Sequence, residues 1–345
     1  MKSYKLLPLL LSFFLHQCST NKIFKNKSCP VYFMDLVENS SIPLIDQSHP
    51  GSSGNKRGYE GGTVFMHKGE FHMFVTEEIN GWIHTRTGHW KSTNGEGWDR
   101  IGTVQTSETK TYNNARNAIW SPMPVFNINE NRWNLFYVGY ENNEKGGLCC
   151  GRVFRAYSTI SGENGVGGPF ADIPQTVLSH YDEKKDPWEG IQGADSFFPF
   201  SIGKKWYAFY GSSDSKSRWD VGLAVSDNIE GKWTRDSIAI PNFTYSENPI
   251  VVQLKDGTYF SVFDDLSHGE PSATIGYSYS IDGINWEQKV LKVEMPRWAI
   301  NIRTPQSLIY AGNNEYWMYF TANTNSNFDC IGRMKLKIGT RQKSL

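Results

Sequence analysis

The stretch Phe197-Phe-Pro-Phe-Ser-Ile-Gly-Lys-Lys-Trp-Tyr-Ala-Phe-Tyr210 decides the fold, because its pattern returns along the chain. An apolar run reaches a glycine-containing tip and resumes as a dense aromatic run, which predicts two half-buried strands joined by a tight turn. Four other stretches share this order of apolar run, polar or glycine tip and aromatic strand: residues 63–74, 124–137, 250–263 and 307–320. The sequence therefore predicts five related β-hairpins.

The hairpins recur at a roughly regular interval. The first aromatic residues after the five tips are Phe71, Trp133, Trp206, Tyr259 and Tyr316, and the steps between them are 62, 73, 53 and 57 residues. A unit of this size is one small sheet that cannot bury both of its faces alone. Such sheets are stable when they pack around a common axis. We therefore predict an all-β chain folded as a five-bladed β-propeller.

Composition and length favour one domain with no nucleic-acid partner. The chain has 345 residues, with 35 basic against 35 acidic residues, and no block of five or more basic residues. No glycine-rich phosphate loop precedes a predicted helix. The hairpins run from about residue 59 to 322 without a linker-like break, so residues 30–345 are predicted to form a single propeller, which we expect to be a monomer.

The N-terminus differs from the rest of the chain. Residues 1–18 combine a short positive region with an apolar run that is too short to span a membrane and stops at Cys18. This resembles a bacterial lipoprotein signal, with residues 19–29 as a polar tether. We expect an exported protein anchored by lipid on Cys18, periplasmic or at the cell surface. Gln17 departs from the small residue usual before that cysteine, so ordinary secretion stays an alternative.

The remaining cysteines have several possible states. Cys29 and Cys330 flank the propeller at its two ends, and a disulfide between them would close the ring. The adjacent Cys149 and Cys150 are expected to be packed thiols, with a strained vicinal disulfide as the alternative. No Cys or His spacing typical of zinc is present, so no cofactor is expected. A structural cation such as calcium in the central channel is left open.

The residues just before each apolar run are the candidates for a functional site. In a propeller the innermost strands of all blades converge on one rim, and each blade contributes one strand start to it. The five starts place these side chains there: Glu60, Trp120, Asp195, Glu247 and Arg303. Three of the five are carboxylates at equivalent positions. This equivalence is the strongest functional signal in the sequence.

These phased carboxylates, with the step Trp120-Ser-Pro, resemble the five-bladed glycosidases of glycoside hydrolase family 43 and its relatives. The resemblance implies that Glu60 is the general base, that Asp195 tunes the pKa of the acid, and that Glu247 is the general acid. The family has Asp where this chain has Glu60, which reaches one methylene further. The residues themselves fit this chemistry, because glycoside hydrolysis needs one protonated and one ionised carboxyl group.

Sugar binding adds further candidates near the rim. Aromatic faces stack on sugar rings, which points to Trp120 and Phe197. Guanidinium groups pair bidentately with carboxylates, which points to Arg303 and Arg116. Of the histidines near the predicted rim, His268 is the preferred candidate.

The sequence thus predicts an exported glycoside hydrolase acting on an oligosaccharide or polysaccharide, with inversion at the anomeric carbon. A non-catalytic glycan-binding lipoprotein is the first alternative. A polysaccharide lyase is less favoured, because three carboxylates suit hydrolysis better than lysis.

Overall fold

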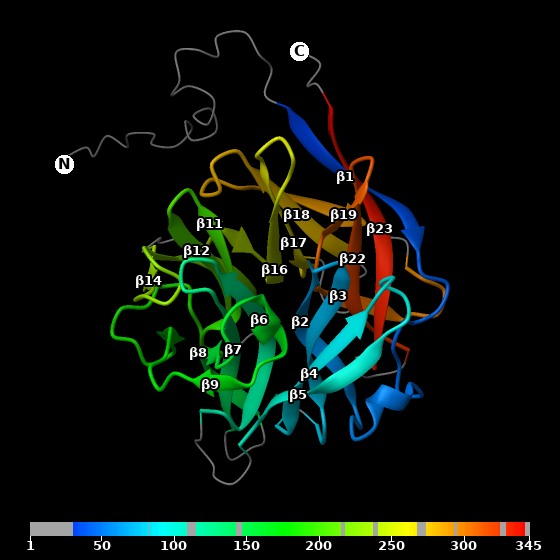
Figure 1. Ribbon diagram of the computed structural model, residues 1–345. Coiled ribbons are helices and arrows are strands. Elements are labelled where there is room, and N and C mark those ends of the chain that lie inside the picture. Colours follow the sequence, from blue (N-terminus) through cyan, green and yellow to red (C-terminus); the bar gives the residue numbers. More distant parts are fainter. Residues whose placement is uncertain are drawn as a thin grey trace, which may run out of the picture.

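The computed structural model describes residues 30–81, 83–108, 115–142, 147–214, 218–236, 241–267, 274–292, 295–324 and 329–341. They form five antiparallel sheets arranged as a five-bladed β-propeller, as the hairpin pattern predicts. Figure 1 shows β2, β6 and β16 close to the centre of the ring. Two short 3-10 helices complete the described elements, η1 (Pro50–Ser52) and η2 (Glu163–Gly167).

In blades one to four the strands follow one another in the chain from the centre outward, whereas the outermost strand of blade five is the first strand of the chain. Blade one contains β2 (Gly58–His67), β3 (Glu70–Glu78), β4 (Thr85–Ser92) and β5 (Asp99–Thr106). Blade two contains β6 (Ala118–Asn127), β7 (Arg132–Asn142), β8 (Leu148–Ser158), β9 (Phe170–Asp172) and β10 (Leu178–Ser179). Blade three contains β11 (Asp195–Ile202), β12 (Lys205–Ser213), β13 (Trp219–Ser226), β14 (Thr234–Arg235) and β15 (Phe243–Thr244).

Blade four contains β16 (Ser246–Gln253), β17 (Tyr259–Asp265), β18 (Thr274–Ser280) and β19 (Glu287–Lys292). Blade five contains β20 (Asn301–Pro305), β21 (Ile309–Gly312), β22 (Glu315–Asn323), β23 (Cys330–Arg341) and β1 (Val31–Asn39). The phased aromatic residues of the sequence lie at the first or second position of the second strand of each blade. The predicted hairpins are therefore confirmed.

The ring is closed by pairing the two ends of the chain. The strand β1 runs antiparallel to β23 and forms the outer edge of blade five, so blade five combines residues from both termini. Figure 1 shows these two strands side by side, β1 in blue and β23 in red. Main-chain hydrogen bonds thus close the ring. The expected bridge involves Cys29, which lies outside the described residues, and Cys330 is a buried free cysteine.

Aromatic side chains fill the space between neighbouring blades. Phe197 of blade three packs on Phe136 of blade two and on Trp233, with ring centroids 5.2 Å and 5.0 Å apart. Phe243 and Phe263 stack between blades three and four at 4.7 Å. Each pair removes large apolar surface from water, which a single four-stranded sheet cannot do for both of its faces.

The innermost strand of every blade breaks its pairing at an equivalent point. One residue takes a left-handed backbone with φ between 51° and 66°, and the register with the next strand shifts there. The five residues are Gly61, Ser121, Ser196, Asn248 and Thr304. Four of them are not glycine, and such residues cost about 1–3 kcal/mol each in this conformation. Bulges of this kind re-aim the neighbouring side chain and cluster at functional sites.

Among the described residues, no helix has the length and apolar character needed to cross a membrane.

Candidate active site

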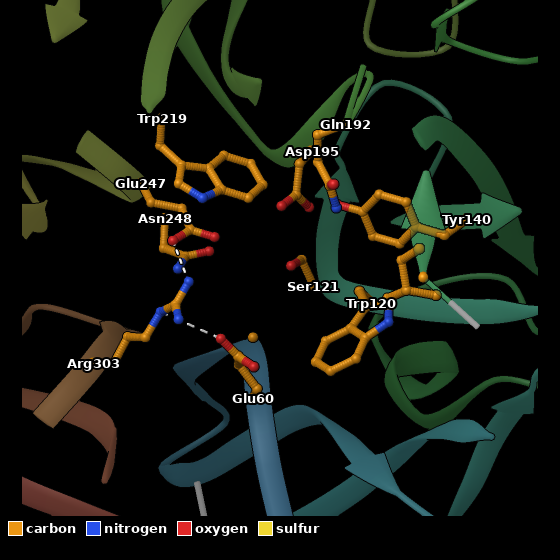
Figure 2. Close-up of a pocket in the computed structure, with 13 residues that line it drawn as sticks. Glu60, Trp120, Ser121, Tyr140, Gln192, Asp195, Trp219, Glu247, Asn248 and Arg303 are labelled. Atoms are coloured by element: carbon orange, nitrogen blue, oxygen red, sulfur yellow. Dashed lines mark hydrogen bonds and ion pairs between the residues drawn. The ribbon is translucent and has the colours of Figure 1, made fainter. Parts of the chain in front are cut away.

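A pocket of about 460 Å³ opens where the five innermost strands converge. This volume lies within the range typical of small-ligand sites. Figure 2 shows its side chains converging from several blades. The lining residues are Glu60, Gly61, Trp120, Ser121, Tyr140, Gly147, Leu148, Gln192, Asp195, Trp219, Glu247, Asn248 and Arg303.

The five strand starts singled out in the sequence all meet in this pocket. Each of these residues directly precedes one of the five left-handed residues, so the bulge turns its side chain toward the axis. Blade one shows why the bulge residue there is glycine. A Cβ on Gly61 would lie 2.8 Å from the Oγ atom of Ser121, closer than side chains normally approach. The fold therefore brings Glu60, Asp195 and Glu247 to one cavity.

Arg303 connects the carboxyl groups of the site. Its guanidinium contacts Glu247 closely, and its Nε atom lies 3.4 Å from Oε1 of Glu60. The same Nε atom lies 3.8 Å from Oδ2 of Asp264, which the sequence analysis did not single out. Figure 2 shows Arg303 between Glu60 and Glu247. Of the described residues that line the pocket, Arg303 is the only basic one, so acidic groups outnumber it.

Glu247 is placed to hold a proton. Burial raises the pKa of its carboxyl well above the usual range, because desolvation penalises the charged form. Arg303 opposes this shift, whereas the charges of Asp264, Asp195 and Glu60 add to it. Burial outweighs the guanidinium because the side chain is only 5% exposed. A carboxyl in this state can donate a proton at neutral pH.

Asp195 lies on the blade-three side of the pocket and is held by hydrogen bonds. The backbone N–H of Ser196 donates to its Oδ1 atom at 2.7 Å. Burial raises the pKa of Asp195, while hydrogen bonds from Tyr140 and Ser196 and the charge of Arg303 oppose that rise. Burial also raises the pKa of Tyr140 well above its usual value, so its hydroxyl remains a donor. Asp195 is thereby fixed in orientation.

Two tryptophans provide apolar faces for a ring-shaped ligand. Figure 2 shows Trp219 and Trp120 on opposite sides of the pocket. Trp120 comes from β6, as the sequence predicts, and Trp219 begins β13 in blade three. Sugar rings bind through such faces and through hydrogen bonds to their hydroxyl groups. The pocket thus combines stacking surfaces with acid groups.

Two predicted residues, Arg116 and Phe197, are not among the described residues that line the pocket. Arg116 pairs with Asp172 at 3.1 Å and lies over the ring of Phe154, which is a structural contact in blade two. Phe197 is 1% exposed in the core between blades two and three, because the bulge at Ser196 reverses the alternation of side chains after Asp195. His268 lies outside the described residues. These contacts of Arg116 and Phe197 give no support for a role of either residue in sugar binding.

Several residues that line the pocket were not predicted from the sequence. Tyr140 belongs to the second strand of blade two, Trp219 to the third strand of blade three, and Gln192 to the segment before β11. None of these three residues stands at the start of an innermost strand, where the repeat locates equivalent positions. Asn248 and Ser121 carried a usable signal, because each directly follows a predicted residue.

The two adjacent cysteines directly follow Leu148, which lines the pocket. Cys149 and Cys150 are free, and their Sγ atoms are 2.7 Å apart. Both thiols lie with Glu141 in a group whose ligand atoms are within 4.8 Å of one another. Arg152 pairs with the Glu141 carboxylate, so that carboxylate already has a cationic partner.

No family model matches the chain, and no curated protein matches it. Solved structures do match. One described as "Glycoside hydrolase" superposes with a TM-score of 0.65 over 90% of this chain and 92% of its own, at 15% identity. Zg3597, a family 117 glycoside hydrolase from Zobellia galactanivorans, gives a TM-score of 0.60 over 90% of both chains at 12% identity. The fold is that of the propeller glycoside hydrolases.

A thermostable family-43 glycoside hydrolase also has this fold, with a TM-score of 0.54 over 83% of this chain and 90% of its own at 15% identity. The similarity of this chain to five-bladed propeller glycoside hydrolases, inferred from its phased carboxylates, is thus confirmed at the level of the fold. At identities this low the shared fold transfers neither the activity nor the substrate of these enzymes to this chain.

Proposed function

We propose that this protein is a glycoside hydrolase that cleaves an oligosaccharide or polysaccharide with inversion of the anomeric centre. One observation carries the proposal: Glu60 and Glu247, from blades one and four, line the same pocket and contact the same guanidinium. Hydrolysis of a glycosidic bond needs two carboxyl groups on either side of one sugar.

The two carboxyl groups have different roles in this proposal. Glu247, whose pKa is raised by burial, gives its proton to the leaving oxygen. Glu60 activates the attacking water on the other side of the sugar ring. Its side chain is 10% exposed, against 5% for Glu247, which suits contact with water. Arg303 holds both carboxyl groups in place.

The remaining pocket residues bind and orient the sugar. Trp120 and Trp219 stack against its ring, and Gln192 offers its amide group to the sugar hydroxyls. Asp195 orients the site and adds negative charge near Glu247. Export and lipid anchoring at Cys18 form part of the proposal and rest on residues 1–18 of the sequence.

Purified protein, incubated with a panel of aryl glycosides and plant, algal and microbial polysaccharides, tests the proposal. We expect release of reducing sugar or aryl alcohol from at least one substrate. Calorimetric binding of a glycan that is never cleaved would instead support the glycan-binding alternative. An unsaturated product absorbing near 235 nm would indicate a lyase and would contradict hydrolysis.

A further inference from the structure

Asp264 lies opposite the proposed proton donor across a strand pair. It belongs to β17 and is the cross-strand partner of Glu247 in β16, so the two residues are direct neighbours across the strand pair. Asp264 is 3% exposed. Its Oδ1 atom accepts a hydrogen bond from the backbone N–H of Thr304 at 2.8 Å, and its Oδ2 atom accepts one from Nδ2 of Asn248 at 2.9 Å.

Comparison with blade one shows which hydrogen bond a residue at the position of Asp264 must accept. In blade one the equivalent residue is Thr76, the partner of Glu60. The Oγ1 atom of Thr76 accepts the backbone N–H of Ser121, which is the left-handed residue of the following blade, at 3.1 Å. Asp264 does the same for Thr304, the left-handed residue of blade five. A neutral hydroxyl therefore suffices to hold the next blade.

Asp264 is the only charged residue at this position in the five blades. The residues opposite the five strand starts are Thr76, Val138, Gly211, Asp264 and Thr321. A buried carboxylate is costly unless it is compensated. A threonine at this position would hold the next blade without the cost of a buried charge. An effect of the Asp264 charge on Glu247, the residue opposite it, explains why a carboxylate is present instead.

We propose that Asp264 is a positioning residue for the proton donor, and that its negative charge acts on Glu247 across the β16–β17 pair. This inference rests on the proposed function and extends it to a residue that does not line the pocket. Asp195 shares the role, but the effect of Asp264 on Glu247 is the larger of the two.

The charges facing Glu247 fix the direction of the effect. Arg303 favours its ionised form, and Asp264, Asp195 and Glu60 disfavour it, in that order of size. Burial raises the pKa of Asp264 to about 7, and it raises the pKa of Glu247 well above its usual value. Asp264 therefore carries negative charge beside Glu247 as the pH rises through and above neutral. Removing its charge makes Glu247 lose its proton at lower pH.

The test is the pH dependence of kcat/KM in Asp264→Asn and Asp264→Thr. The threonine variant reproduces the blade-one arrangement and keeps an acceptor for Thr304, so it guards against a loss of folding. We expect the alkaline limb to move down by about one pH unit or more in both variants, and further than in Asp195→Asn. KM should change little, because Asp264 does not line the pocket. Asp265→Asn is the matched control, since Asp265 is also buried, lies next in β17 and is not among the groups with the largest effects on Glu247.

An alkaline limb that stays in place in both folded variants would overturn the inference, as would an equal shift in Asp265→Asn. A wild-type protein without turnover would overturn the proposed function instead. In that case the inference is tested by carbon NMR titration of side-chain-labelled glutamate, with Glu247→Gln identifying the Glu247 signal. The signal should titrate at lower pH in Asp264→Thr than in wild type, and an unchanged titration would refute the role of Asp264.

Discussion

Replacing Arg303 with Gln removes the cation that joins three buried carboxyl groups. The side chains of Glu60, Glu247 and Asp264 are 10%, 5% and 5% exposed, and each has an atom within 4 Å of the guanidinium. Removing one partner of a buried ion pair costs about 3–5 kcal/mol. We expect the lower end, about 3 kcal/mol at pH 8, because Glu247 and Asp264 can bind protons in place of the lost cation.

This loss of stability should depend on pH in a defined direction. Without the guanidinium, the pKa values of Glu247 and Asp264 in the folded state rise further above their unfolded values near 4. Stability then falls as the pH rises from about 4 through and beyond 7, since the folded state binds more protons than the unfolded state. The variant should therefore lose the least stability near pH 4 to 5.

Differential scanning calorimetry of wild type and Arg303→Gln between pH 5 and pH 8 measures the effect. For a domain of this size, about 3 kcal/mol corresponds to a decrease in Tm of roughly 5 °C. We expect this decrease at pH 8 and less than half of it at pH 5. Arg132→Gln is a suitable control, because neither Arg132 nor its partner Glu230 lines the pocket, and the pKa of Glu230 is lowered to about 2. A decrease in Tm for Arg303→Gln that is the same at both pH values would refute the reasoning.

Two further substitutions test the roles of the carboxyl groups. Glu247→Gln should keep the fold and lower kcat by roughly 10² to 10⁴ on substrates with poor leaving groups, because an amide cannot donate the proton; activated aryl glycosides should lose less, and equal losses on both kinds of substrate would contradict a proton-donor role. Asp195→Asn should move the alkaline limb of kcat/KM to lower pH, because it removes a negative charge near Glu247. A limb that stays in place or moves upward in pH–rate measurements would instead indicate that Asp195 is structural.

The sequence is sufficient to predict the fold and the first layer of the site, because both depend on a repeated pattern. Each hairpin has the same order of apolar run, tip and aromatic strand, so the start of each innermost strand can be located in all five blades. Glu60, Asp195 and Glu247 occupy equivalent positions, and equivalent positions in a propeller meet at the axis. Because of the repeat, residues that are far apart in the sequence but equivalent in their blades lie close together in space.

The residues that sequence reasoning placed wrongly or missed depend on geometry that the repeat does not encode. Phe197 follows Asp195 by two residues and would share its face in a regular strand, but the left-handed Ser196 turns it into the core. Trp219 reaches the pocket from the third strand of its blade, which the phasing argument did not consider. Asp264 becomes informative only when the cross-strand register is known.

The ring closure could not be predicted for a similar reason. The strand β1 precedes the first hairpin and carries no copy of the repeat. It becomes part of blade five only because β23 leaves an unpaired edge that β1 can cover.

The most direct test of the central claim is the configuration of the first sugar released. Proton NMR, recorded before mutarotation on a substrate that the protein cleaves, identifies the anomer. If Glu247 donates the proton and Glu60 activates water, the product has the opposite configuration to the substrate, as inversion requires. A first-formed sugar with the substrate's own configuration would contradict this account and would make Glu60 a nucleophile.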